Sequence, residues 1–243
     1  MKKLLIAAVL AGVSLSAGAA ETIRFATEAS YPPFEFVDAS NKIQGFDIDL
    51  ANAMCKEMQA TCTFTNQAFD SLIPSLKFRR FDAVISGMDI TADRLKQVSF
   101  TNAYYDNSAI FIAQKGKFTD IASLKGKRVG MQNGTTHQKF LMEKHPEITA
   151  VPYDSYQNAV LDLKNGRLDA VFGDTAVVNE WLKQNKNLAA VGDKITDQSY
   201  FGTGLGVAVR QDNSALLGKM NDALAKVRQD GTYKTLYTKW FQQ

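Results

Sequence analysis

The stretch FDSLIPSLKFRRFDAVISGMDITADR, residues 69–94, decides the fold because most of it recurs further along the chain. The second copy reads DSYQNAVLDLKNGRLDAVFGD, residues 154–174. When Arg80 is aligned with Arg167, the Leu-Lys pair and the Asp-Ala-Val triplet of the first copy, residues 76–77 and 82–84, fall on the same residues of the second copy, 163–164 and 169–171. The Asp-Ser pairs at 70–71 and 154–155 are three residues out of register. The chain therefore contains two units of one design.

Each copy predicts a short helix, a tight turn and a buried strand. Ser71 and Ser155 can each cap an amphipathic helix whose last turn is basic, and an apolar strand follows at once. Open α/β sheets bind ligands outside the carboxyl ends of their strands, which here are residues 86–89 and 173–174. If the units belong to separate lobes that face each other, these ends line one cleft. The alternative is that both units belong to one sheet and match by chance.

Residues 1–19 have the parts of a secretory signal peptide, namely Lys2-Lys3, an apolar run over 4–15 and small residues after it. Cleavage fits after Ala19 or Ala20, and Ala19 is favoured. The apolar run is too short to span about 30 Å of hydrocarbon. No cysteine follows the cleavage region to accept a lipid, so we expect a soluble mature protein in the periplasm.

The composition is that of a globular protein. Removal of Lys2 and Lys3 lowers the formal net charge from +3 to +1, so the mature chain has no electrostatic reason to bind nucleic acid or an anionic membrane. Its length suits one large domain or two smaller lobes. Cys55 and Cys62 are expected to form a disulfide in an exported protein. No metal or cofactor is expected, because neither histidine lies at ligand spacing from the cysteines.

The mature chain opens with a predicted strand at 22–26 and a loop in which Pro32-Pro33 forbids helix. Glu28 and Tyr31 then lie on a stiff loop at the carboxyl end of the first strand, where ligand-facing residues are expected. A solvated carboxylate and a packing tyrosine are the alternatives. A core helix at 46–58 and a strand at 62–65 follow, and Thr91 can cap a short helix that carries Arg94.

A second segment begins near Ser108 and has predicted strands at 106–114 and 127–131. The second strand leads through a glycine turn into a helix that ends near Lys144. Free backbone N–H groups at Thr135 and Thr136 would form an anion site at the start of this helix, suited to a carboxylate. Phosphate is the alternative, although the P-loop pattern is absent.

The last part of the chain predicts a return path to the first lobe. Residues 200–209, YFGTGLGVAV, predict a glycine-spaced strand. Its glycines do not fit the dinucleotide pattern G-x-G-x-x-G, so we interpret them as a flexible path between the lobes and not as a dinucleotide-binding loop. A helix at 214–229, capped by Asn213, and a short aromatic helix then close the chain. Both helices are expected to pack on the first lobe.

Together these motifs resemble the polar amino-acid-binding periplasmic proteins of ABC importers, and in particular their enterobacterial arginine-binding members. The likeness spans the whole chain and rests on the signal peptide and on residues 31–34, 45–50, 69–76, 87–91, 94, 134–136, 172–174 and 202–204. It implies an α/β fold of the type II periplasmic-binding-protein kind, with two lobes, each a central sheet flanked by helices, and a ligand cleft between them. Lobe 1 is expected at 20–107 and 204–243, and lobe 2 at 108–203. The resemblance also implies the Cys55–Cys62 disulfide.

The resemblance assigns the residues that hold the ligand's α-carbon. Arg94 corresponds to the arginine that grips the α-carboxylate, with Thr136 and the backbone at Met88 and Asp89 completing the cage. Asp174 corresponds to the acid that meets the α-ammonium, together with the Gly87 carbonyl and position 89. Relatives carry Ser or Thr at position 89, so Asp89 should favour a cationic ligand unless it pairs with Arg94 instead.

The resemblance also assigns the residues around the ligand's side chain. Tyr31 and Phe69 match aromatic walls against which a guanidinium can stack, and Glu28 matches the acid that meets a basic side-chain end. The expected ligand-binding residues are Glu28, Tyr31, Phe69, Ser86, Gly87, Met88, Asp89, Arg94, Thr135, Thr136, His137 and Asp174.

The implied function is a receptor, not an enzyme. It would capture L-arginine by closure of two lobes and deliver it, as a monomer, to the inner-membrane permease of an ABC transporter. The alternative is a secreted enzyme on the same fold that acts on a small amino-acid-like substrate. Against catalysis, the sequence lacks G-x-S-x-G and H-E-x-x-H, and neither histidine has a recognisable nucleophile beside it.

Overall fold

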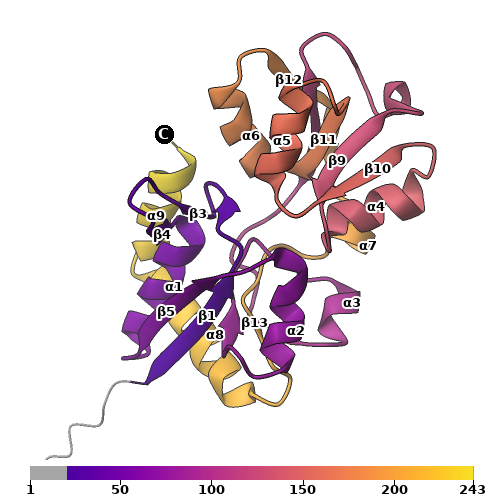
Figure 1. The fold of residues 1–243 in the computed structure, drawn as a ribbon. Coiled ribbons are helices and arrows are strands. Elements are labelled where there is room, and N and C mark those ends of the chain that lie inside the picture. The colour runs from indigo at the N-terminus through magenta and orange to yellow at the C-terminus, as the bar shows by residue number, and fades with distance from the viewer. Residues whose placement is uncertain (1–20, 243) are drawn as a thin grey trace, which may run out of the picture.

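The computed structural model describes residues 21–242, and its helices and strands form two lobes (Figure 1). The predicted signal peptide at 1–19 lies outside the described residues. Within 21–242, no helix is long and apolar enough to cross a membrane. The architecture is the two-lobed α/β fold that the sequence predicts, with helices flanking a central sheet in each lobe.

The first lobe is built on a five-stranded sheet in the order β5-β1-β6-β13-β7. Its strands are β1 (Thr22–Thr27), β5 (Thr61–Asn66), β6 (Ala83–Val84), β7 (Ser99–Phe100) and β13 (Ala208–Val209). Strand β1 is parallel to β5 and β6, whereas β13 is antiparallel to β6 and β7. The helices of this lobe are α1 (Phe46–Glu57), η1 (Phe69–Ser71), α2 (Leu72–Lys77), α3 (Ala92–Leu95), α8 (Ser214–Gln229) and α9 (Thr232–Phe241). A small antiparallel sheet of β2 (Ser30–Tyr31), β3 (Glu35–Val37) and β4 (Ile43–Gln44) lies beside α1.

The second lobe repeats this plan with the order β10-β9-β11-β8-β12. Its strands are β8 (Ala109–Gln114), β9 (Arg128–Gln132), β10 (Thr149–Tyr153), β11 (Ala170–Asp174) and β12 (Leu188–Ile195). Its helices are η2 (Ala122–Leu124), α4 (Thr136–Lys144), α5 (Tyr156–Lys164), α6 (Thr175–Gln184) and α7 (Gln198–Phe201). Strand β9 is parallel to β10 and β11, while β8 is antiparallel to β11 and β12.

The two sequence copies occupy equivalent places in the two sheets. Strands β6 and β11 follow the repeated helices α2 and α5, and each is the third strand of its sheet. Each lies between one parallel and one antiparallel neighbour. The repeat therefore reflects the architecture, and the alternative that both copies belong to one sheet is wrong.

The returning segment is not the predicted strand over most of 200–209. Residues up to Phe201 form helix α7, and only Ala208–Val209 pair as strand β13, with Leu205 bridging Asp89 and Tyr105 on the way. Gly202 has φ of +63°, and a Cβ added there would lie 1.8 Å from the Ile90 carbonyl oxygen. The glycines thus serve a tight turn against the first lobe, because extended pairing would need negative φ.

The helix caps agree with the sequence at three of four predicted positions. The side chains of Thr91, Ser155 and Asn213 each accept a hydrogen bond from a backbone N–H in the first turn of α3, α5 and α8. Ser71 does not cap α2, because it already belongs to the 3₁₀ helix η1 and its hydroxyl donates to the Ala68 carbonyl oxygen at 2.6 Å. The Ser71 prediction is therefore wrong.

Two further packing predictions are confirmed. A disulfide joins Cys55 at the end of α1 to Cys62 in β5. The C-terminal helices α8 and α9 pack on α1 in the first lobe, where the Trp240 indole N–H donates to an Asp49 carboxylate oxygen at 2.8 Å. The end of the chain thus belongs to the lobe in which it began.

Candidate functional site

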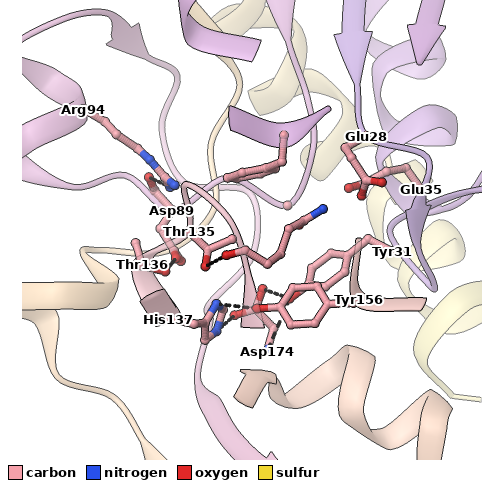
Figure 2. A pocket seen from close by; sticks show the side chains of 13 residues that line it. Glu28, Tyr31, Glu35, Asp89, Arg94, Thr135, Thr136, His137, Tyr156 and Asp174 are labelled. Carbon is pink, nitrogen blue, oxygen red and sulfur yellow. Dashed lines mark hydrogen bonds and ion pairs between the residues drawn. The ribbon is translucent and has the colours of Figure 1, made fainter. Parts of the chain in front are cut away.

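A cavity with about 290 Å³ of empty space lies between the lobes (Figure 2). The first lobe contributes Glu28, Tyr31, Glu35, Phe69, Gly87, Asp89 and Arg94, and the second contributes Gln132, Thr135, Thr136, His137, Tyr156 and Asp174. The walls of the cavity come from the carboxyl ends of β1, β9 and β11, from the segment that follows β6, and from the helices and small sheet beside them.

Arg94 is a buried cation without a carboxylate partner among residues 21–242. Its Nη1 donates to the Asp89 backbone oxygen at 3.0 Å and its Nη2 to the Gly134 oxygen at 3.4 Å. Its guanidinium carbon lies 5.5 Å from the centre of the Phe69 ring. Burial lowers the pKa of Arg94, although the Asp89 and Asp174 carboxylates act in the opposite direction. The guanidinium is therefore oriented by neutral oxygens and kept available for an anion.

The start of helix α4 lies beside Arg94, whose Nη2 reaches the Gly134 oxygen just before the helix cap. Thr135 caps the helix by accepting from the Gln138 N–H, and its own hydroxyl donates to the Gln132 backbone oxygen at 2.7 Å. The first N–H groups of an α helix have no partner within the helix, and the dipole adds positive potential. This arrangement matches the anion site that the glycine turn predicts.

Two buried carboxylates lie beside this anion site and share a donor. The Asn107 side-chain amide donates to Asp89 at 2.8 Å and to Asp174 at 2.7 Å. Asp89 also accepts from the Thr136 hydroxyl, and Asp174 accepts from the Tyr31 hydroxyl, each at 2.7 Å. Burial first, and the Asp174 charge second, raise the pKa of Asp89 to about 6. Asp89 is thus not used in an ion pair with Arg94, and the two carboxylates together form a place for a cation.

His137 lines the same wall and contacts two of its polar neighbours. Its Nδ1 lies 3.0 Å from the Tyr156 hydroxyl, and its Nε2 lies 3.1 Å from an Asp174 carboxylate oxygen. The imidazole is buried edge-on against Phe172. The imidazole therefore lies against Asp174 in the wall of the cavity.

Aromatic rings and two more carboxylates complete the cavity. The Tyr31 ring stacks on Tyr156 at 5.2 Å, and Phe69 lies beside Arg94. Glu28 and Glu35 lie at the end of the cavity away from Arg94 (Figure 2). Burial raises the pKa of Glu28. One end of the cavity is therefore cationic and the other is acidic.

Two of the twelve residues expected at the ligand do not line the cavity. The Ser86 hydroxyl lies behind it, where it accepts from the Glu28 N–H at 2.9 Å and donates to Glu35 at 3.1 Å. The Met88 side chain packs in the core of the first lobe with Ala26, Leu72 and other apolar residues. The chain bends at Ser86-Gly87, where Gly87 has φ of +50°, and Gly87 and Asp89 line the cavity while Ser86 and Met88 do not.

Sequence reasoning missed three lining residues and the bridging Asn107. Gln132 is the last residue of strand β9, so the rule for carboxyl ends of strands had the signal to find it. Tyr156 opens helix α5 directly after its Ser155 cap, and Glu35 opens the short strand β3. No motif distinguishes these last two from packing residues.

Within residues 21–242, no cluster of three or more His, Cys, Asp or Glu side chains could hold a metal ion. Two hydrogen bonds cross between the lobes inside the cavity, from Tyr31 to Asp174 and from Thr136 to Asp89. What the cavity offers is binding at several points: a guanidinium and a helix start for an anion, two carboxylates for a cation beside it, and an acidic far end.

Comparison with known proteins shows that the chain is similar to bacterial solute-binding proteins. The pattern that defines the bacterial extracellular solute-binding proteins, family 3, matches residues 23–243. The chain is 73% identical to the putative ABC transporter arginine-binding protein 2 of Escherichia coli K12 over the full length of both, and 64% identical to ABC transporter arginine-binding protein 1 of that strain. A solved Salmonella typhimurium periplasmic binding protein, described as having high arginine specificity, is 56% identical with a TM-score of 0.89 and covers 91% of this chain and 100% of its own.

Proposed function

Because the chain belongs to the bacterial extracellular solute-binding proteins of family 3, we propose that it captures L-arginine between its two lobes in the periplasm and delivers it to the permease of an ABC transporter. Its similarity to proteins named for arginine binding supports this ligand. Those relatives are named as binding proteins, which favours a receptor over a secreted enzyme. We further propose that the protein acts as a monomer.

The observation that carries the proposal is the order of charges along the cavity. Arg94 and the start of α4 would hold the ligand's α-carboxylate, and Asp174 with Asp89 would hold its α-ammonium. Tyr31 and Phe69 would flank the aliphatic and guanidinium parts of the side chain. Glu28 would accept from the guanidinium at the far end. A neutral side chain would leave that buried acid without a partner, which costs affinity.

The proposed organisation follows from the two sheets. Residues 20–107 and 204–243 would form lobe 1 and residues 108–203 lobe 2, so that the ligand's partners come from both. A leader at 1–19 would direct export and be removed.

The proposal is tested by thermal unfolding of the mature protein with arginine, lysine, ornithine, citrulline, histidine and glutamine. Arginine should raise the melting temperature most, and it should be recovered unchanged after long incubation. A larger rise with a neutral amino acid would contradict the arginine assignment. Chemical conversion of arginine would support the enzyme instead.

A further inference from the structure

A cluster of three buried carboxyl groups lies at the acidic end of the cavity. Glu28 follows β1, Glu35 opens β3 and Asp47 lies in the first turn of α1. Their exposed fractions are 7%, 1% and 0%. Only Glu28 and Glu35 line the cavity, and Asp47 lies behind them. No Lys, Arg or His of the described chain forms an ion pair with any of the three. The cluster is therefore a buried acidic site that lacks a cation.

If both carboxyl groups are ionised, Glu35 Oε2 and Asp47 Oδ1 accept no hydrogen bond within residues 21–242. The second oxygen of each of these two carboxyl groups does accept hydrogen bonds. Ser86 donates to Glu35 Oε1 at 3.1 Å, while the Gly87 N–H and the Tyr104 hydroxyl donate to Asp47 Oδ2 at 2.8 and 2.7 Å. Buried oxygens without donors are costly, and two facing carboxyl groups remove that cost by sharing a proton.

The surroundings favour such sharing. Burial raises the pKa of Glu35 well above its ordinary value, and the nearby Asp47 and Glu28 charges add to this. Burial also raises the pKa of Asp47, to about 6. The other titratable group that faces the pair is Tyr104, whose phenol remains neutral because burial raises its pKa. Within residues 21–242 no cation pairs with the cluster, which favours the protonated form of Glu35 when no ligand is bound.

We infer that Glu35 is a second specificity-determining carboxylate, which receives the cationic end of the ligand side chain beside Glu28 and releases the proton it shares with Asp47 as that cation binds. The inference rests on the proposed function. A guanidinium carries five N–H donors in one plane, more than Glu28 alone can accept. Its charge would stabilise the ionised form of Glu35, and the proton would pass to solvent. A neutral side-chain end cannot cause this release, so the acid pair would select against it.

Calorimetry of the mature protein tests the inference directly. Titration with arginine in buffers of different ionisation enthalpy gives the number of protons released on binding. Arginine should release up to about one proton near neutral pH, and citrulline clearly less. Citrulline is the matched control, because it has the same α-carboxylate and α-ammonium and differs at the side-chain end. Any proton linked to Asp89, Asp174 or His137 is therefore common to both ligands.

The variant Glu35→Gln should bind arginine at least about tenfold more weakly. It should also remove the difference in proton release between arginine and citrulline. The ratio of its affinities for arginine and citrulline should be smaller than that of wild type. Glu57→Gln, at the partly buried end of α1 and outside the cavity lining, is the control and should behave as wild type. A difference in proton release between arginine and citrulline that persists in Glu35→Gln would overturn the inference, because Glu28 would then be its source.

Wild-type protein alone provides a second measurement if Glu35→Gln fails to fold. The affinity for arginine relative to citrulline should increase as the pH rises from about 5 to about 7, since release of a proton is then easier. A constant ratio would overturn the inference while leaving arginine as the ligand. Absence of arginine binding at any pH would instead overturn the proposed function, and this inference with it.

Discussion

At the scale of single residues, the decisive feature is how differently the charged groups of the cavity are paired. Arg94 is held only by carbonyl oxygens, whereas Asp89 and Asp174 are held by neutral donors from Asn107, Thr136 and Tyr31. Hydrogen bonds from neutral groups orient a buried charge without neutralising it, so the charge can still attract a ligand group of opposite sign. The cavity is thus preorganised for a ligand that carries both charges close together.

Replacement of Arg94 by Ala should remove arginine binding. Loss of one partner from a desolvated ion pair costs about 2 to 5 kcal/mol, or roughly 30-fold to several thousandfold in the dissociation constant. Titration calorimetry measures the change. Arg80→Ala is the matched control, because Arg80 is an exposed arginine of the same repeat copy. An Arg94→Ala affinity within a few-fold of wild type would exclude Arg94 from the binding site.

Asp89 should make the stability of the ligand-free protein depend on pH. Its pKa is raised from 3.8 to about 6 in the folded state, so the folded chain binds more protons between these values. The stabilisation from this group is complete below the lower value and is lost as pH rises through about 6. Asp89→Asn should therefore melt about 2 to 4 °C or more above wild type near neutral pH, and close to it near pH 4.

Thermal melts of ligand-free wild type and Asp89→Asn across this pH range provide the measurement. Asp222→Asn, at an exposed position on α8, is the control and should follow the wild-type curve. If Asp89→Asn melts below wild type near neutral pH, the unneutralised charge is not the dominant cost at this position.

At the scale of elements, the sequence predicts what repeats or caps locally and misses what depends on distant contacts. The repeat placed β6 and β11 correctly, because a short amphipathic helix followed by an apolar strand is a local pattern. The prediction of a strand over 200–209 was wrong for most of that range, because the chain turns at Gly202 against the Ile90 carbonyl, which is distant in sequence. Glu35 and Tyr156 were missed for the same reason, since only the tertiary structure brings β3 and α5 to one cavity.

The Cys55–Cys62 disulfide links α1 to β5 across a short loop and should add stability to the first lobe. Closing a loop of this length contributes about 2 to 3 kcal/mol in the chain-entropy model. The double variant Cys55→Ala/Cys62→Ala should show that loss in urea unfolding, with arginine affinity nearly unchanged because neither cysteine lines the cavity. Equal unfolding midpoints for the variant and the oxidised wild type would contradict the prediction.

At the scale of the whole molecule, the lobes meet through polar contacts around the cavity. Tyr31 reaches Asp174, and Asp89 reaches Thr136, inside it. Nearer the surface, the Asn133 amide donates to Asp70 at 2.8 Å, and Lys139 pairs with Asp93. Each contact joins one lobe to the other, so separation of the lobes would break them together.

Arginine should therefore shift the protein toward a more compact form. The ligand's charged groups have partners in both lobes, and their burial together makes each pair stronger than on an open surface. Small-angle scattering with and without saturating arginine measures this, and the radius of gyration should decrease. An unchanged distance distribution would contradict closure even if binding were tight.

Loss of an interlobe ion pair should weaken arginine binding without touching the ligand. Lys139 and Lys144 both lie on α4, but Lys139 pairs with Asp93 in the first lobe while Lys144 pairs with Asp197 in its own. Lys139→Ala should weaken affinity by no more than about fivefold, because the pair is exposed, and mainly through faster dissociation. Lys144→Ala should have no effect. Equal affinities for the two variants would show that the Lys139 pair does not support closure.

The position of strand β13 determines the order in which the two lobes can be completed. The strand lies between β6 and β7 in the first sheet, yet residues 208–209 follow all five strands of the second sheet in the chain. As the N-terminus emerges first, β6 keeps an unpaired edge until the last part of the polypeptide arrives, and such edges invite wrong pairing. The second sheet, contained within 109–195, needs no such wait. We therefore expect the lobe that begins first to be completed last, with one edge of β6 unpaired until then.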